Sequence, residues 1–166
     1  MNRKISISYG IIAGVATVGY YLLFYFFNRA SFFDLYIWWG GILPMIVFMF
    51  LGGIAQRKAN GGELTFRTAL TTTFLVFMVS SLLFYIFYYI LLKYIDPDLL
   101  RVQQETALAN LERFSNGKDK DLRPYQEFYE EEDLSIAIRP LVFRYVQSLI
   151  GGFILSLLAA FTLKTK

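Results

Sequence analysis

Apolar residues in this chain gather into four long blocks, and the charged residues lie almost entirely in the stretches between those blocks. A helix needs about 20 predominantly apolar residues to cross a bilayer core of about 30 Å. Each block reaches or nearly reaches that length, and none has an ionisable residue at its centre. We therefore predict an all-α fold, an integral membrane four-helix bundle that forms a single domain over residues 1–166. The predicted transmembrane helices cover about residues 5–27, 36–56, 66–94 and 141–163.

The stretch of about residues 96–138, between the third and fourth predicted spans, has a different pattern. Apolar residues of Leu99–Phe114 recur at roughly helical spacing and are interleaved with glutamines and glutamates, which indicates an amphipathic helix. Asn116-Gly117 is a typical C-cap pair, and Pro124 can open a second helix. We expect this insert to be an extramembrane helical hairpin that lies on or just above the bilayer.

Acidic residues are concentrated late in this insert, in the run Glu130–Asp133. Such a run is most often the solvated face of a helix. The alternative is a weak site for a divalent cation or for a basic partner, and both interpretations stand at this point.

Asp96 and Pro97 mark the point where the third predicted span stops. Proline disfavours the α conformation in the residue before it, which predicts a break in the helix near Ile95. Aspartate is a strong N-cap residue and proline favours the first helical position, so we expect Asp96 to cap a new helix that starts at Pro97. The alternative is a cation site formed by Asp96 and Asp98. That pair offers few of the about six or more oxygens that Ca²⁺ prefers.

Aromatic residues cluster where the second predicted span begins and where the third one ends. Tyrosine and tryptophan favour the headgroup level of a bilayer because their rings are amphipathic. We therefore interpret these residues as an interfacial belt, and the alternative is an aromatic cage for a ligand. The belt comprises Tyr36, Trp38, Trp39, Tyr85, Tyr88, Tyr89 and Tyr94.

The distribution of charge predicts the orientation of the chain. Basic residues near helix ends favour the cytoplasmic side. With both termini inside, the cytoplasmic segments hold seven basic residues and one acid, whereas Ile95–Arg139 holds six basic and eleven acidic residues, a net charge of −5. We therefore expect a multi-pass membrane protein with both termini in the cytoplasm. The seven basic residues are Arg3, Lys4, Arg57, Lys58, Arg67, Lys164 and Lys166.

Several classes of chemistry lack their usual residues in this chain. It has no cysteine and no histidine, so it lacks a thiolate nucleophile, a thiolate metal ligand and the commonest general base. The net charge of +3 comes from residues at helix ends and does not indicate nucleic-acid binding. We expect no cofactor, no metal site, no catalytic residue and no nucleic-acid partner.

Small residues repeat at every fourth position in parts of the first and fourth predicted spans. Such stripes let helix backbones approach closely. We expect the first and fourth helices to pack together inside the bundle, and the alternative is a homodimer face. The stripes are Ser6, Gly10 and Gly14 in the first span, and Ser148, Gly152, Ser156 and Ala160 in the fourth.

Two short motifs flank the third predicted span. GGELTF, at Gly61–Phe66, precedes it, and IDP, at Ile95–Pro97, follows it. With these motifs and this layout, the chain resembles a widespread family of small bacterial four-helix membrane proteins that is described only as a domain of unknown function. The resemblance implies a location in the bacterial inner membrane, and it implies no catalytic residue and no substrate. Physically, the two glycines favour a tight turn, and we expect Thr65 to cap the third helix.

These features favour a non-enzymatic membrane protein that acts as a scaffold or accessory subunit. It would engage lipid or a membrane partner through the extramembrane hairpin, or it would form a homo-oligomer. The alternatives are a small oligomeric transporter or channel, and an enzyme acting on lipid-linked substrates. Low polarity inside the spans disfavours the first alternative, and the second would need its chemistry from the acidic residues of the insert.

Overall fold

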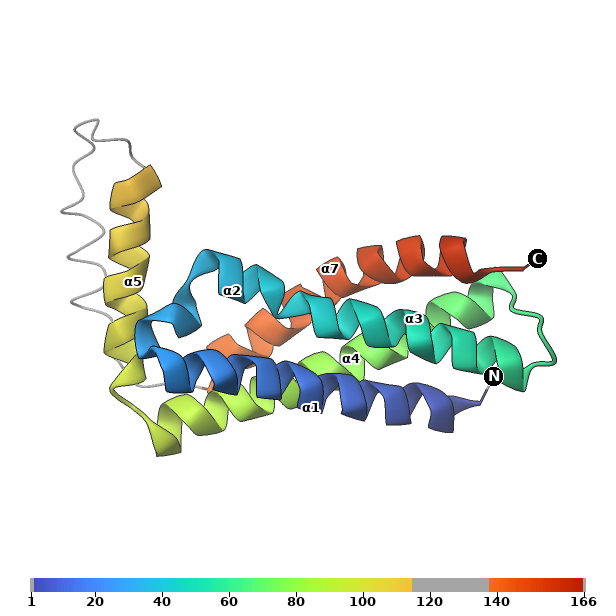
Figure 1. Ribbon diagram of the computed structural model, residues 1–166, viewed down its shortest axis with the longest axis horizontal. Helices are drawn as coiled ribbons and strands as arrows, with labels where there is room; N and C mark the ends of the chain where they lie inside the picture. The colour runs from blue at the N-terminus through green and yellow to red at the C-terminus, as the bar shows by residue number, and fades with distance from the viewer. Residues whose placement is uncertain (1, 115–137, 166) are drawn as a thin grey trace.

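The structure, a computed structural model, describes residues 2–114 and 138–165. Figure 1 shows the described chain as an elongated group of helices with one helix set across its end. The elements in chain order are α1 (Arg3–Phe27), the 3₁₀ turn η1 (Arg29–Phe33), α2 (Leu35–Gly40), α3 (Ile42–Ala59), α4 (Phe66–Ile90), the π turn η2 (Leu91–Ile95), α5 (Leu99–Phe114) and α7 (Ile138–Leu163).

Four helical segments of the described chain are long and apolar enough to cross a membrane, which confirms the predicted all-α, four-span architecture. The first helix of the predicted insert is α5. The predicted turn at Asn116-Gly117, the second helix of the hairpin and the acidic run Glu130–Asp133 lie outside the described residues. The four segments are Arg3–Phe27, Leu35–Ala59, Phe66–Ile95 and Leu141–Leu163.

The central helix of the bundle is α4, which packs against α1, α3 and α7. Four of its small polar residues are buried, and side chains of this size allow close helix approach on several sides. Figure 1 shows both ends of the chain at the end of the bundle opposite to α5. We call these two ends of the bundle the α5 end and the terminal end. The buried small polar residues of α4 are Thr72, Thr73, Ser80 and Ser81.

The stripes of small residues lie at helix contacts, but the predicted pairing of the first and fourth spans is wrong. Helices α1 and α7 each pack mainly on α4 and make no comparable contact with each other. A Cβ built on Gly10 or Gly14 would lie 2.7 Å from the nearest side-chain atom of α4. A Cβ on Gly152 would overlap the ring of Phe77, also on α4. A stripe permits close approach but does not specify which helix approaches. Of the other stripe residues, Ser6, Ser156 and Ala160 are buried and Ser148 is half-buried.

The second span is interrupted at Gly41, between α2 and α3. Pro44 has no backbone N–H and its ring clashes with the carbonyl four residues earlier, so an unbroken helix is disfavoured here. The hydroxyl of Tyr21 on α1 donates to the carbonyl of Trp38, at 3.0 Å, and satisfies a backbone acceptor beside the interruption. A side chain at Gly41 would overlap Tyr21, so glycine makes this contact possible.

A tight turn joins α3 to α4 at the terminal end. Gly61 and Gly62 have φ angles of 72° and 95°, which glycine adopts without strain. Thr65 is the N-cap of α4, because its Oγ1 accepts a hydrogen bond at 3.4 Å from a backbone N–H in the first turn. The N–H of Leu64 donates to Oγ1 of Thr165 at 2.7 Å, so this turn is tied to the residues that follow α7.

Candidate functional site

The third span ends in the single π turn η2, directly before Asp96. The N–H of Asp96 donates to the carbonyl of Leu91 at 2.8 Å, which is the bond that defines a π turn. Asp96 has φ −144° and ψ 75°, outside the α region, as expected for a residue that precedes proline. The helix therefore breaks after Ile95, where Pro97 predicts the break.

The side chain of Asp96 has a different role from the predicted one. Its carboxylate accepts a hydrogen bond from the hydroxyl of Tyr25 at 3.0 Å and pairs with the guanidinium of Arg29. Helix α5 begins at Leu99, later than the predicted start at Pro97, and the Leu99 N–H bonds to the backbone carbonyl of Asp96. The N-cap prediction for Asp96 is therefore wrong. Its carboxylate instead joins the end of α1 to the break after α4.

A metal at this junction would need further ligands. Among the described residues, no group of three or more His, Cys, Asp or Glu side chains is placed to hold a metal ion. The charge that faces the Asp96 carboxylate is the Arg29 guanidinium.

Aromatic residues near the α5 end pack against one another inside the protein. The ring centroids of Tyr21 and Phe84 lie 4.7 Å apart, and Phe32 stacks on Tyr88 at 6.3 Å. Trp38 meets Tyr88 edge-on at 6.1 Å. Tyr88 is only 2% exposed, so it is a core residue and not a member of an interfacial belt. The exposed members of the predicted belt include Tyr36, Trp39 and Tyr94.

Helix α5 starts on this aromatic cluster and departs from the direction of the bundle. Leu99 is fully buried at its base, and the hydroxyl of Tyr88 donates to Oε1 of Gln103 at 3.3 Å. Figure 1 shows α5 standing across the end of the bundle and projecting beyond α2 on one side. Arg101 and Glu105 are exposed and pair with each other at 3.3 Å. The helix is thus fixed at its base and presents polar side chains to its surroundings.

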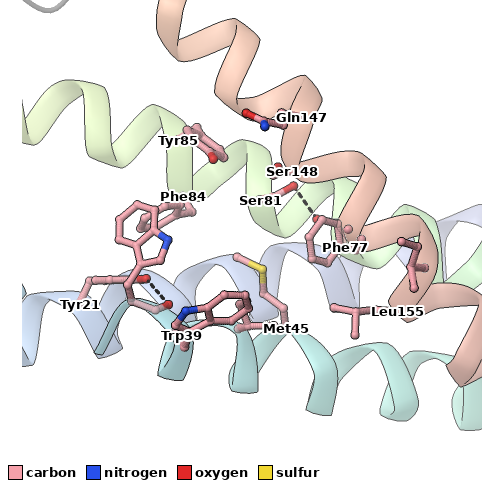
Figure 2. A pocket seen from close by; sticks show the side chains of 16 residues that line it. Tyr21, Trp39, Met45, Phe77, Ser81, Phe84, Tyr85, Gln147, Ser148 and Leu155 are labelled. Carbon is pink, nitrogen blue, oxygen red and sulfur yellow. Dashed lines mark hydrogen bonds between the residues drawn. The ribbon is translucent and has the colours of Figure 1, made fainter. Parts of the chain in front are cut away.

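A cleft opens in the α5 half of the bundle between α3 and α7, with α4 at its base. These two helices contact each other much less than each contacts α4, which leaves the space between them open. The cavity has a volume of about 410 Å³. Figure 2 shows side chains from the α2–α3 region, from α4 and from α7 surrounding it. They include Trp39, Met45, Phe77, Tyr85, Gln147 and Leu155.

Serine hydroxyls along the cleft are bonded within the protein. Ser81 donates to the carbonyl of Phe77 at 2.8 Å, and Ser148 donates to that of Tyr145 at 2.7 Å. A serine whose hydroxyl donates to its own helix backbone has no donor left for a ligand. The side-chain amide of Gln147, in contrast, has no hydrogen-bond partner in the part of the chain that the structure describes. The cleft is therefore largely apolar, with a free amide near its α5 end.

Sequence reasoning missed Tyr25, Arg29 and Gln147 as functional candidates. Arg29 follows the first span and Asp96 follows the third, so both lie at the same side of the bundle, and this was the available signal for their pairing. Tyr25 is one of many aromatic residues in the first span, and nothing in its spacing distinguishes it. The polar position of Gln147 inside an apolar span was visible, but the cleft beside it was not.

The fold and this site define the class of the protein: the described chain is all-helical and has the layout of a multi-pass membrane protein. Residues 8–165 match the model of the family described as Protein of unknown function (DUF4199), and the chain belongs to this family. The match agrees with the resemblance noted in the sequence. Comparison with curated proteins and with solved structures gave no match.

Proposed function

We propose that this protein is a non-enzymatic accessory subunit, or scaffold, that binds a membrane partner protein at its α5 end. The observation that carries the proposal is the placement of α5. This helix is fixed on the bundle at one end, projects beyond it, and exposes charged side chains near its base. A helix in that position offers a surface that the packing of the bundle itself does not use.

The base of α5 is held by contacts with two other parts of the chain. Asp96, just before the helix, pairs with Arg29 after α1. Leu99 is buried, and Gln103 is bonded to Tyr88 of α4. Binding through a surface that is already ordered loses less conformational entropy than binding through a flexible one. The fixed base therefore supports the use of α5 for docking.

The proposal places the protein in the bacterial inner membrane with both termini in the cytoplasm. Exposed basic residues gather at the terminal end, and a basic end favours the cytoplasmic side. The partner would then meet α5 on the opposite side of the membrane. The basic residues described at the terminal end are Arg3, Lys4, Arg57, Lys58, Arg67 and Lys164.

Site-specific photo-crosslinking in intact cells tests this proposal. A photoreactive amino acid at Arg101 or at Glu105 should give an adduct with one defined protein, identified by mass spectrometry. The same amino acid at Lys58, which is exposed at the opposite end, is the matched control and should not give that adduct. Adducts with lipid alone, or the same proteins captured from both ends, would contradict the proposal. Solute flux through liposomes that contain only this protein would favour the transporter alternative instead.

A further inference from the structure

We propose that the cleft between α3 and α7 binds one acyl chain of a membrane lipid. The cleft lies inside the membrane-spanning part of the bundle, whereas the proposed docking surface is α5 at its end. The two proposals rest on different residues, so either can fail without the other.

The size of the cleft selects a lipid chain over a partner helix. A helix with its side chains is about 10–12 Å wide, so four turns of one occupy roughly 2,000 Å³. The cleft holds about 410 Å³. That volume lies within the range of about 300–1,000 Å³ that is typical of small-molecule sites. The cleft is therefore too small to hold a helix of a partner, but it can hold a single flexible acyl chain.

The lining of the cleft is suited to a hydrocarbon chain. Its deeper part, toward the terminal end, is formed by side chains without ionisable groups, among them Met45, Phe77 and Leu155. Near the α5 end, the hydroxyl of Tyr85 donates to the carbonyl of Arg144 at 3.3 Å. Like the serine hydroxyls beside it, this group is occupied within the protein. A polar ligand would find few free partners in the cleft, whereas an acyl chain needs none.

The position of Gln147 predicts how the bound lipid is oriented in the cleft. Gln147 lies six residues after the start of the span at Leu141, which is about 9 Å along the helix. Its free amide can donate to an ester carbonyl of a lipid whose chain runs from there toward Leu155. Figure 2 shows Gln147 and Tyr85 toward one end of the cleft and Leu155 toward the other. This gradient from polar to apolar matches a lipid that lies with its headgroup at the α5 end.

Two glycines provide a matched pair of variants. Gly151 lines the cleft, and no atom outside its own stretch of helix backbone lies within 4 Å of a Cβ built on it. A larger side chain there would therefore occupy the cleft without a clash at Cβ. Gly19, on α1 and away from the cleft, has the same open surroundings. Gly151→Phe should prevent the acyl chain from binding in the cleft, and Gly19→Phe should not.

The experiment uses the protein in vesicles of phosphatidylethanolamine and phosphatidylglycerol. The vesicles contain a trace of phospholipid that carries a diazirine in one acyl chain. After illumination, labelled peptides are mapped by mass spectrometry. In the wild type, label should concentrate in residues 147–155 and in the facing part of α3, and excess unlabelled phospholipid should compete it away. Gly151→Phe should lower labelling of these peptides about tenfold, which corresponds to about 1.4 kcal/mol of binding. Gly19→Phe should leave it unchanged.

Gln147→Leu provides a second, independent variant, since it removes the amide but keeps the apolar volume of the side chain. It should weaken labelling by a few fold without abolishing it. Label spread evenly around the bundle, or cleft labelling that excess lipid does not compete, would overturn the proposal. Both outcomes are measured on the wild type, so they test the proposal even where a variant fails to fold.

Discussion

The carboxylate of Asp96 pairs with the guanidinium of Arg29, although the two residues lie 67 positions apart in the chain. The side chain of Asp96 is 11% exposed and that of Arg29 is 47% exposed, so the pair is shielded from solvent on one side only. It fastens the end of α1 to the break between α4 and α5. The pair therefore connects the membrane bundle to the helix that projects from it.

Asp96→Asn should lower the stability of the protein by about 1–2 kcal/mol, because it removes the negative charge that pairs with Arg29. Solvent around the half-exposed Arg29 screens the pair and limits the loss. An N-cap aspartate would tolerate asparagine with little loss, so this substitution separates the two roles. Unfolding in detergent measures the effect. In an Arg29→Ala background, the same substitution should change stability much less.

Asp98→Asn is the control for this cycle, since Asp98 is exposed and follows the same proline. We expect the stability of this variant to equal that of the wild type. An Asp96→Asn variant that matches the wild type would show that the pair does not contribute to stability.

Gly152→Ala should destabilise the bundle by about 1–3 kcal/mol, because the added methyl group overlaps the ring of Phe77 and forces α7 away from α4. Gly151→Ala, one position earlier, adds the same methyl group to open space and is the matched control. Thermal melting in detergent compares the two variants. Equal melting temperatures would contradict close packing at Gly152.

Tyr21→Phe should lower stability by about 1–2 kcal/mol, since it leaves the partly buried carbonyl of Trp38 without its hydrogen bond. Tyr9→Phe is the control, because the hydroxyl of Tyr9 has no partner in the described chain. Chemical unfolding of the two variants side by side measures the difference. A stability loss that is the same for both would remove the special role of Tyr21.

A reporter fused after Lys166 should be active in the cytoplasm, and one inserted between Asn116 and Gly117 should be active on the other side of the membrane. The reason is the concentration of basic residues around the termini and in the loop before the third span. Alkaline phosphatase and green fluorescent protein fusions report the two sides. The reverse pattern at these two positions would overturn the orientation.

The spans could be predicted from the sequence because crossing a bilayer imposes a length and a polarity that each segment must meet on its own. Thr65 and the turn at Gly61 and Gly62 follow equally from local rules, since a cap and a positive φ depend on neighbouring residues. The break before Pro97 is local as well.

The role of Asp96 could not be predicted by the same means. The capping rule considers the residues that follow an aspartate, whereas the partners of this one, Tyr25 and Arg29, come from another span. The pairing of the stripes failed for a related reason, because small residues favour close contact with any helix. The cleft results from weak contact between α3 and α7, and no single segment of sequence carries that information.

The central position of α4 also bears on the order in which the bundle assembles. Helices α1, α3 and α4 contact one another and all precede α7 in the chain, so their packing can be completed before the last span is made. At about 5–20 residues per second, synthesis of the stretch between Ile95 and Ile138 takes several seconds. During that interval, the side of α4 that later packs against α7 borders on the bilayer. For a bundle whose first three spans have packed by then, the last step of assembly is an exchange, in which the newly inserted helix displaces lipid from the surface of α4.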